Sequence, residues 1–318
     1  MGTLSIIDIG SNTIHLLIVD IPSKDRFRIL YEDKEHLRLG SELATNKVIS
    51  NIKIADTLTI LKKYISISNT FKASSIIAVA TEALRSAENN HYILDLIKTK
   101  LGLPIKLLSS HEEAYLAFLG VKKTFNIPKG IIIDSGGAST EFIGVINNSF
   151  VTSASIPLGA INVTEKIHVD SNGKFIFCEY TQDYFNELFS KIRWINEFNN
   201  STLIGIGGTL KNFRSIYNNL NVKSLPNNFI TEMSLDELNS LCNFLKKLSL
   251  SERKALKGLS SKRSDIILGG CEIINNFVKY LNFDKIILSE SGLRTGVLFH
   301  YMDIIFDHNI DKNKSIIS

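Results

Sequence analysis

The stretch GIIIDSGGASTE, Gly130 to Glu141, sets three isoleucines directly before an acid, two glycines and three hydroxyl residues. The β-branched run Ile131–Ile133, ended by Gly136 and Gly137, predicts a short interior strand that enters a tight turn, because glycine permits positive φ. Such a turn presents successive backbone N–H groups to a phosphate. Taken alone, however, the pattern is more typical of an ordinary hairpin.

The same pattern occurs at two other places in the chain. The segment LSIIDIGSNT, Leu4 to Thr13, also has aliphatic residues, then Asp, one further residue and Gly, and LIGIGGT, Leu203 to Thr209, ends a later aliphatic run in the same way. The first two similar segments lie more than a hundred residues apart, which is far longer than the period of a solenoid repeat. The repeat therefore predicts duplicated domains that face each other with paired phosphate clamps.

Length and composition limit the class of protein. A chain of 318 residues with 44% hydrophobic and 21% charged residues is typical of two globular domains. A net charge of +4 from scattered lysines is compatible with a polyanionic ligand but argues against a nucleic-acid binder. Three separated cysteines argue against zinc and a disulfide framework and favour the cytoplasm. Since no apolar run reaches about 20 residues, we expect no membrane span.

The order of expected elements is typical of an α/β protein with its ligand between two halves. Strands are expected at 4–9, 13–20, 27–31, 76–79, 105–108, 142–146, 150–156, 203–206 and 285–288, and helices at 50–67, 90–101, from 109, at 182–198, 234–248, 251–256 and 265–280, and after 294. The polar connector Phe125–Gly130 predicts a boundary between residues 1–124 and residues 125–318.

Three acids stand at or beside the glycine turns: Asp8, Asp134 and Glu141. A single acid in such a place is typical of a turn cap. Because these acids recur in duplicated turns, they are better explained as cation ligands or as groups that orient water. Hard carboxylate ligands favour Mg²⁺, with Mn²⁺ as an alternative.

Two further sites could take part in phosphate chemistry. Glu112 and Glu113 open a helix, where the macrodipole alone favours acids, yet either carboxylate could serve as a general base toward water. Arg85 follows a strand and is either a surface ion-pair partner or a bidentate ligand of a phosphoryl group. Without a nucleophilic Cys or His constellation, the pattern favours direct in-line attack of water on phosphorus.

Eight motifs together resemble the exopolyphosphatase / guanosine pentaphosphate phosphohydrolase (Ppx/GppA) family in its short two-domain form. They are IDIGSNTIHLLIVD (7–20), ATEALRSAEN (80–89), HEEAYLAFLGV (111–121), DSGGASTEFIGV (134–145), SIPLGAINVTE (155–165), GIGGTLKN (205–212), RSDIILGGCEII (263–274) and SESGLRTGVL (289–298). The resemblance implies two ribonuclease-H-like domains of the actin, sugar kinase and Hsp70 superfamily, with the active site in the cleft between them. It also implies that the tail from about residue 299 packs back on the N-terminal domain.

The resemblance implies a role for each matching residue. Glu113 is similar to the family's catalytic base, Arg85 to its phosphate-binding arginine and Glu141 to its magnesium-linked glutamate, while Asp8 and Asp134 match the acids of the two clamps. The phosphate-binding residues would be Gly10, Ser11, Asn12, Gly136, Gly137, Ala138, Ser139, Gly207 and Gly208.

Two residues depart from the family pattern. Ala138 replaces a third successive glycine, so we expect an ordinary φ there, since positive φ would cost alanine about 1 kcal/mol or more. Asn162 stands where many short members have an arginine, which removes one expected contact to the distal polyanion.

The activity implied is Mg²⁺-dependent release of terminal phosphate from inorganic polyphosphate. Hydrolysis of pppGpp to ppGpp is the alternative, and a non-catalytic polyphosphate or nucleotide sensor is a third possibility. The partners expected are these small polyanions, without nucleic acid or membrane, and a second copy of the chain, because the family often dimerises.

Overall fold

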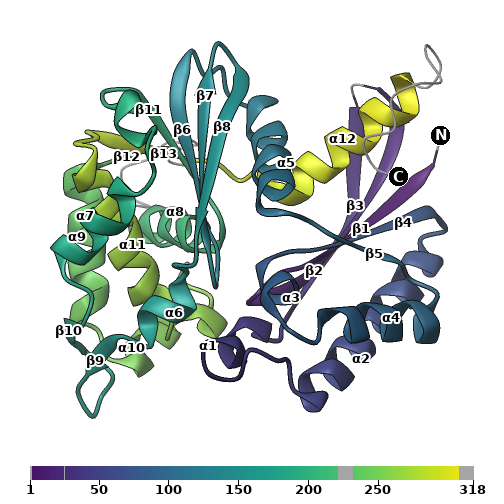
Figure 1. Ribbon diagram of the computed structural model, residues 1–318, viewed down its shortest axis with the longest axis horizontal. Coiled ribbons are helices and arrows are strands. Elements are labelled where there is room, and N and C mark those ends of the chain that lie inside the picture. The colour runs from purple at the N-terminus through teal and green to yellow at the C-terminus, as the bar shows by residue number, and fades with distance from the viewer. Residues whose placement is uncertain (1, 25, 221–231, 308–318) are drawn as a thin grey trace. The chain divides into compact units, whose positions relative to one another are not determined.

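The structure is a computed structural model that describes residues 2–24, 26–220 and 232–307 (Figure 1). The described residues form two compact units. The first contains the chain up to Thr124 together with the residues from Ser291 onward, and the second contains Phe125–Glu290. Each unit is built around one mixed β-sheet with helices packed on it.

The first unit has a five-stranded sheet in the order β3-β2-β1-β4-β5. Its strands are β1 (Thr3–Ile9), β2 (Thr13–Ser23), β3 (Arg26–His36), β4 (Ala73–Ala80) and β5 (Ile105–Leu107), and its helices are α1 (Leu43–Asn46), α2 (Asn51–Thr70), α3 (Glu82–Ser86), α4 (Asn90–Leu101), α5 (Ser110–Lys122) and α12 (Leu293–Asp307). Strands β1 to β3 form an antiparallel meander, whereas β4 pairs parallel with both β1 and β5. The prediction of strands in this half is confirmed.

Both faces of this sheet are covered, which explains why β1 is apolar at nearly every position. Successive side chains of a strand point to opposite faces. Ile7 and Ile9 belong to the apolar core that includes residues of α2 and α4, while Leu4 and Ile6 belong to the core that includes residues of α5 and α12.

Local signals set the ends of the helices in the first unit. The Ser50 hydroxyl accepts a hydrogen bond from the Lys53 amide at the start of α2, and Gly102, with a φ of 63°, ends α4 at the predicted residue. Helix α5 begins with a capping box formed by Ser109 and Glu112.

The second unit repeats the strand order of the first. Its elements are β6 (Lys129–Ser135), β7 (Thr140–Ile146), β8 (Ser149–Ile156), α6 (Ala160–Thr164), β9 (Ile167–Val169), β10 (Phe175–Cys178), α7 (Gln182–Ser190), β11 (Thr202–Ile206), α8 (Gly208–Leu220), β12 (Glu232–Ser234), α9 (Leu235–Lys247), α10 (Leu250–Ala255), α11 (Ile267–Tyr280) and β13 (Lys285–Leu288). The sheet order β8-β7-β6-β11-β13 corresponds to β3-β2-β1-β4-β5, with β12 added at the edge. Because the parallel and antiparallel pairings also match, the fold prediction of two ribonuclease-H-like domains is confirmed.

The predicted helix over 182–198 is wrong in its second half. Helix α7 ends at Ser190, and after a turn a short 3₁₀ helix covers Ile195–Phe198. After Ser190 the amides of Ile192, Ile195 and Glu197 donate to carbonyls three positions earlier, which is the hydrogen-bond pattern of 3₁₀ turns, and Ile192, Ile195 and Phe198 are buried. The sequence analysis also missed α8, although Leu210, Phe213 and Ile216 point inward along it.

Within the residues that the structure describes, no helix is both long enough and apolar enough to cross a membrane.

Candidate functional site

The glycine stretch of the second unit forms a hairpin loop, Gly136–Ser139, between β6 and β7. The Gly136 amide closes it by donating to the Ser139 carbonyl at 3.0 Å. Gly136 does not have a positive φ, and neither does Gly10 in the matching loop of the first unit, so the expectation that these glycines serve a left-handed turn is wrong. The reason is steric instead, because a Cβ at Gly136 would lie 3.0 Å from the Ser139 carbonyl oxygen. Ala138 has a negative φ, as predicted.

The segment that begins α6 binds this loop from one side. Three hydrogen bonds do so: the amides of Ala160 and Ile161 donate to the carbonyls of Gly136 and Gly137 at 3.1 and 2.8 Å, and Asn162 Nδ2 donates to the Ala138 carbonyl at 3.1 Å. These three successive carbonyls point toward α6. The N–H groups of Gly137 and Ala138 donate to no backbone acceptor in the described part of the chain. Successive amides left in this way are typical of an anion-binding loop.

The loop Gly10–Asn12 of the first unit is held by the same principle. The Gly10 amide donates to the Thr13 carbonyl at 3.1 Å, while the amides of Arg38 and Gly40 donate to the carbonyls of Asn12 and Ser11 at 3.1 and 2.9 Å. The Ser11 and Asn12 amides therefore lack backbone acceptors among residues 2–24, 26–220 and 232–307. The sequence repeat is thus a repeat of hydrogen bonding, with the carbonyls turned toward a supporting segment in both loops.

Two carboxylates lie beside the loop of the second unit. Asp134 and Glu141 are direct partners across β6 and β7, so their side chains leave the same face of the sheet. Glu141 is 2% exposed, and its Oε1 accepts hydrogen bonds from the hydroxyls of Ser139 at 2.7 Å and Ser155 at 2.9 Å. These hydroxyl donors stabilise a buried negative charge and fix its direction.

The metal prediction requires carboxylates that can meet a hard cation. Among the described residues no group of three or more His, Cys, Asp or Glu side chains is arranged to hold a metal ion. Mg²⁺ usually binds to one or two carboxylates and completes its shell with water and substrate phosphate. The pair Asp134 and Glu141 fits that requirement by donor type and number, whereas Asp8, the third predicted ligand, belongs to the first unit.

The third glycine turn opens α8 with a φ of 96° at Gly207. A Cβ there would lie 2.6 Å from the Ser135 carbonyl oxygen and 2.8 Å from Asp134 Oδ1, so only glycine lets β6 approach this closely. The Arg263 guanidinium packs on Gly208, because a Cβ at Gly208 would lie 2.1 Å from its central carbon. The sequence analysis did not assign Arg263, although its side chain adds positive charge at the start of α8.

Arg85 and Glu113 form an ion pair in the first unit. Arg85 Nη1 donates to Glu113 Oε2 at 3.0 Å and to the Leu108 carbonyl at 2.6 Å, while Nε and Nη2 bind Glu82 Oε2 at 3.1 and 2.6 Å. Burial opposes the charge of Arg85, but the carboxylates of Glu113 and Glu82 outweigh it and raise the pKa of the guanidinium. These bonds use four of its five N–H groups, and the fifth lies on Nη2.

The two neighbouring glutamates at the start of α5 have different environments. Glu113 is buried, with an exposure of 8%. Glu112 is partly exposed, accepts the Ser109 amide at 2.8 Å and pairs with Lys106 at 3.3 Å. The Ser109 backbone hydrogen bond holds the pKa of Glu112 below its ordinary value. The local bonds of Glu112 are therefore those of a helix cap.

In each unit, the predicted site residues lie along one edge of the sheet. In the first unit, Asp8 pairs with Val79 at the carboxyl ends of β1 and β4, and the Thr81 amide at the entry to α3 donates to the Ile9 carbonyl at 3.2 Å. Asp8, the loop Gly10–Asn12 and α3 with Arg85 thus share one edge of the first sheet. In the second unit, the loop 136–139, the two carboxylates and the turn 207–208 share the corresponding edge.

The two sheets and their glycine loops define a class of protein: a two-domain α/β protein with the ribonuclease-H-like fold of actin and Hsp70. The family model described as the Ppx/GppA phosphatase family matches residues 17–304, and the chain belongs to that family.

Relatives and solved structures agree with this assignment. The chain is 30% identical over 310 residues to a bifunctional 3-dehydroquinate synthase/phosphatase of Fusobacterium nucleatum. The aligned region covers 92% of this chain but only 45% of that protein. It is 24% identical to Exopolyphosphatase 1 of Mycobacterium leprae, covering 94% and 89%. The structure of an exopolyphosphatase from Cytophaga hutchinsonii is 26% identical with a TM-score of 0.84, covering 95% and 98%. A Ppx/GppA family member from Aquifex aeolicus, 24% identical with a TM-score of 0.76 and coverage of 98% and 99%, shares the fold.

Proposed function

We propose that this protein is an exopolyphosphatase that releases the terminal orthophosphate of inorganic polyphosphate. The observation that carries the proposal is the pair of hairpin loops, 10–12 and 136–139. In each loop the carbonyls accept hydrogen bonds from a neighbouring segment, and two successive amides lack backbone acceptors among the described residues. Such loops suit an unbranched phosphate chain, because they bind negative oxygens without reading a base or a sugar. The names of the Mycobacterium and Cytophaga relatives support polyphosphate as the substrate.

In the proposed reaction, the oxygen of a water molecule attacks the terminal phosphorus and the bond to the bridging oxygen breaks. Glu113 accepts the proton of the water, the shortened chain leaves as an anion, and orthophosphate is the second product. Arg85, through the N–H on Nη2, offsets negative charge on the terminal phosphoryl group, and its ion pair with Glu113 fixes the direction of that carboxylate.

We propose Mg²⁺ as the cofactor, bound by Asp134 and Glu141, with Asp8 as the further carboxylate of the set. When bound, the ion supplies charge neutralisation of the phosphate oxygens. The Ser139 and Ser155 hydroxyls keep the Glu141 carboxylate in one orientation, because both donate to the same oxygen.

The test is phosphate release from long-chain polyphosphate, tripolyphosphate and pppGpp in the presence of Mg²⁺, with wild type, Glu113→Gln and Glu112→Gln. We expect Glu113→Gln to lower kcat by about 100-fold or more, the usual contribution of a general base. Glu112→Gln is the matched control, since glutamine also serves in a capping box and should leave kcat within about twofold.

Three results would change the proposal. Faster release from pppGpp than from polyphosphate would make pppGpp hydrolysis the function. Loss of activity in Glu112→Gln with retention in Glu113→Gln would move the base to Glu112. No release from any substrate by wild type, together with measurable binding, would favour a sensor without catalysis.

A further inference from the structure

One residue of the first unit has a left-handed backbone conformation that its position in the fold does not explain. Arg38 has a φ of 56° and a ψ of 50°. A residue with a Cβ is disfavoured in that conformation, for which glycine is the usual choice. Residues strained in this way persist only where the surrounding structure holds them, and they cluster at functional sites.

Turn chemistry explains the other six non-glycine residues with positive φ in the described part of the chain. Each of the six follows a helix or lies in the turn between β7 and β8: Lys47, Lys72, Asn147, Asn148, Asn200 and Asn282. Arg38 instead follows β3 and directly precedes the short 3₁₀ helix Leu39–Glu42. Because a glycine would relieve the strain, the arginine side chain itself requires an explanation.

The backbone of Arg38 is bound directly to the glycine loop of the first unit. Its amide donates to the Asn12 carbonyl at 3.1 Å, beside the bond from the Gly40 amide to the Ser11 carbonyl at 2.9 Å. Its carbonyl accepts the Ser41 amide at 3.1 Å and the Ser41 hydroxyl at 2.8 Å. These bonds hold Arg38 on both sides, so its side chain begins at a point that is fixed relative to the amides of the loop.

The segment around Arg38 contacts a second part of the candidate site. The leucines on either side of Arg38 are buried in the same core as Ala83 and Leu84 of α3, whereas Arg38 is only half-buried. The 3₁₀ helix that follows Arg38 also packs against α3, which carries Arg85. The segment therefore contacts both the loop Gly10–Asn12 and the helix of Arg85, and the core does not enclose the Arg38 guanidinium.

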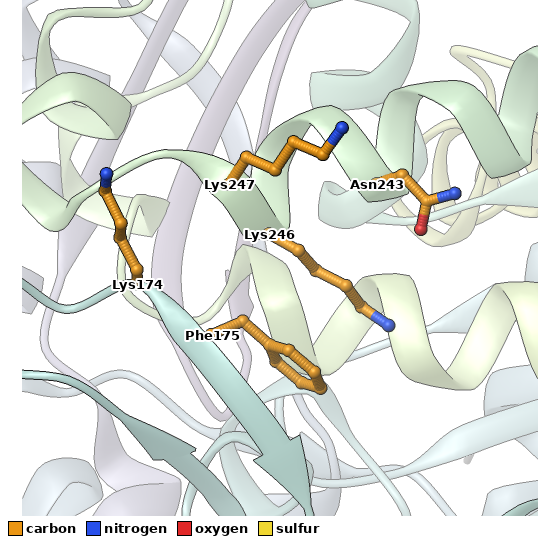
Figure 2. A pocket seen from close by; sticks show the side chains of 5 residues that line it. All are labelled: Lys174, Phe175, Asn243, Lys246 and Lys247. Atoms are coloured by element: carbon orange, nitrogen blue, oxygen red, sulfur yellow. The ribbon is translucent and has the colours of Figure 1, made fainter.

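Basic side chains also line a pocket of about 500 Å³ in the second unit, which Figure 2 shows. The lining residues are Lys174, Phe175, Asn243, Lys246 and Lys247. Three carboxylates offset the three lysines. Glu272 pairs with Lys246 at 2.5 Å, and Glu252 lies near enough to Lys174 for their charges to attract. Asp170 Oδ1 accepts the Lys174 amide at 2.9 Å. Because these charges balance, the pocket has no preference for an anion.

We propose that Arg38 binds the substrate directly, with its guanidinium on the oxygens of the phosphate group held by the loop Gly10–Asn12. This inference rests on the proposed function. A guanidinium binds phosphate through two parallel N–H groups, and it adds the full positive charge that neutral backbone amides lack. Since the Arg38 amide is bound to the same loop, substrate binding has to order little more than the arginine side chain.

The test compares Arg38→Gly and Arg38→Lys with a control, Lys72→Gly. Lys72 has a φ of 54° and is exposed, so the control removes the same charge and the same backbone strain from the first unit. It precedes β4 at the amino ends of β1 and β4, whereas the loop Gly10–Asn12 follows the carboxyl end of β1. Three quantities are measured for each protein: the melting temperature, KM and kcat for tripolyphosphate and long-chain polyphosphate, and the affinity for tripolyphosphate by titration.

We expect Arg38→Gly to be more stable than wild type and to bind substrate more weakly. Its melting temperature should rise by about 2–4 °C, as should that of Lys72→Gly, because glycine adopts positive φ without strain. KM of Arg38→Gly should rise about tenfold or more for both substrates, with kcat within about twofold, since a contact that ground and transition states share affects binding alone. Arg38→Lys keeps the charge and the strain, so it should melt as wild type does and show a smaller rise in KM.

Three outcomes would overturn this inference: an unchanged KM in Arg38→Gly, an equal rise of KM in Lys72→Gly, or a fall in the melting temperature of Arg38→Gly, which would assign the side chain to the fold. If wild type binds tripolyphosphate but releases no phosphate, the proposed function fails, while a tenfold loss of affinity in Arg38→Gly still supports the contact and an equal affinity refutes it. If wild type binds neither polyphosphate, both the proposed function and this inference are wrong.

Discussion

Replacing Gly159 with alanine should displace the glycine loop of the second unit. Gly159 is the N-cap of α6 and has a φ of −117°, so its backbone is compatible with alanine. The added Cβ, however, would lie 2.3 Å from the Ala138 nitrogen and 2.3 Å from the carbonyl carbon and oxygen of Gly137. All three are backbone atoms, so no rotamer change can relieve the overlap.

The size of the effect follows from this geometry. Ordinary Cβ contacts begin at about 3.4 Å, so the loop and α6 must separate by roughly 1 Å. Forcing a methyl group into a packed site costs about 1–3 kcal/mol of unfolding free energy. The same movement stretches the hydrogen bonds from α6 to the loop carbonyls, and a misplacement of about 1 Å at a catalytic site can cost about 100-fold in rate.

The measurements are denaturant unfolding and phosphate release from polyphosphate. Gly144→Ala is the control, because a Cβ there would meet side-chain atoms of Phe198 and Thr152 at 2.8 Å, on β7 and away from the loop. We expect both variants to lose stability but only Gly159→Ala to lose about 100-fold in kcat/KM. Wild-type activity in Gly159→Ala, or an equal loss of activity in the two variants, would refute the link between α6 and the loop.

Two further predictions follow from the hydrogen bonds of single carboxylates. Glu112 and Glu252 accept the backbone amides of Ser109 and Ser249, which lowers the pKa of both. The stability that these carboxylates give is therefore present above the ordinary glutamate pKa of about 4.3 and is lost as the pH falls below it. The melting temperature of Glu112→Gln/Glu252→Gln should fall less steeply than that of wild type between pH 6 and 3. An equal fall in the two proteins would contradict this. Ser155→Ala removes one hydrogen-bond donor from the buried carboxylate of Glu141, so it should cost about 1.5–3 kcal/mol of unfolding free energy. It should also raise the Mg²⁺ concentration needed for half-maximal phosphate release. A Mg²⁺ titration of phosphate release that matches wild type would argue against Glu141 as a ligand.

The features that the sequence predicted most accurately are the ends of helices and turns, which residues close together in the chain determine. The start of α5 follows from Ser109 and Glu112, and the end of α4 follows from Gly102, because each signal acts within a few residues. The turn between β7 and β8 is likewise local: it falls in the short gap between the predicted strands 142–146 and 150–156, where Asn147 and Asn148 both have positive φ. The α/β class followed from the alternation of such local signals.

The supporting contacts of the site could not be predicted, because they join segments that are distant in the sequence. Arg263 packs on Gly208 from 55 positions along the chain, and Arg253 binds the carbonyl of Gly173 at a separation of 80. Nothing in the residues next to an arginine tells which carbonyl or helix end it will meet. The break after α7 was missed for a related reason. The apolar residues of 182–198 recur at a spacing compatible with one helix, and the sequence alone does not show which of them the core buries.

Ala138 shows why the family's run of glycines need not be complete in this chain. If the loop required a left-handed residue at that position, alanine would strain it, yet Ala138 has a negative φ. The close approach that demands a glycine is made on the other side of the contact, where Gly159 faces the Gly137–Ala138 peptide. Asn162, where the family resemblance leads us to expect an arginine, donates to the Ala138 carbonyl from the same helix. These two departures lie on one contact, so a substitution at either position acts on the same interface between α6 and the loop.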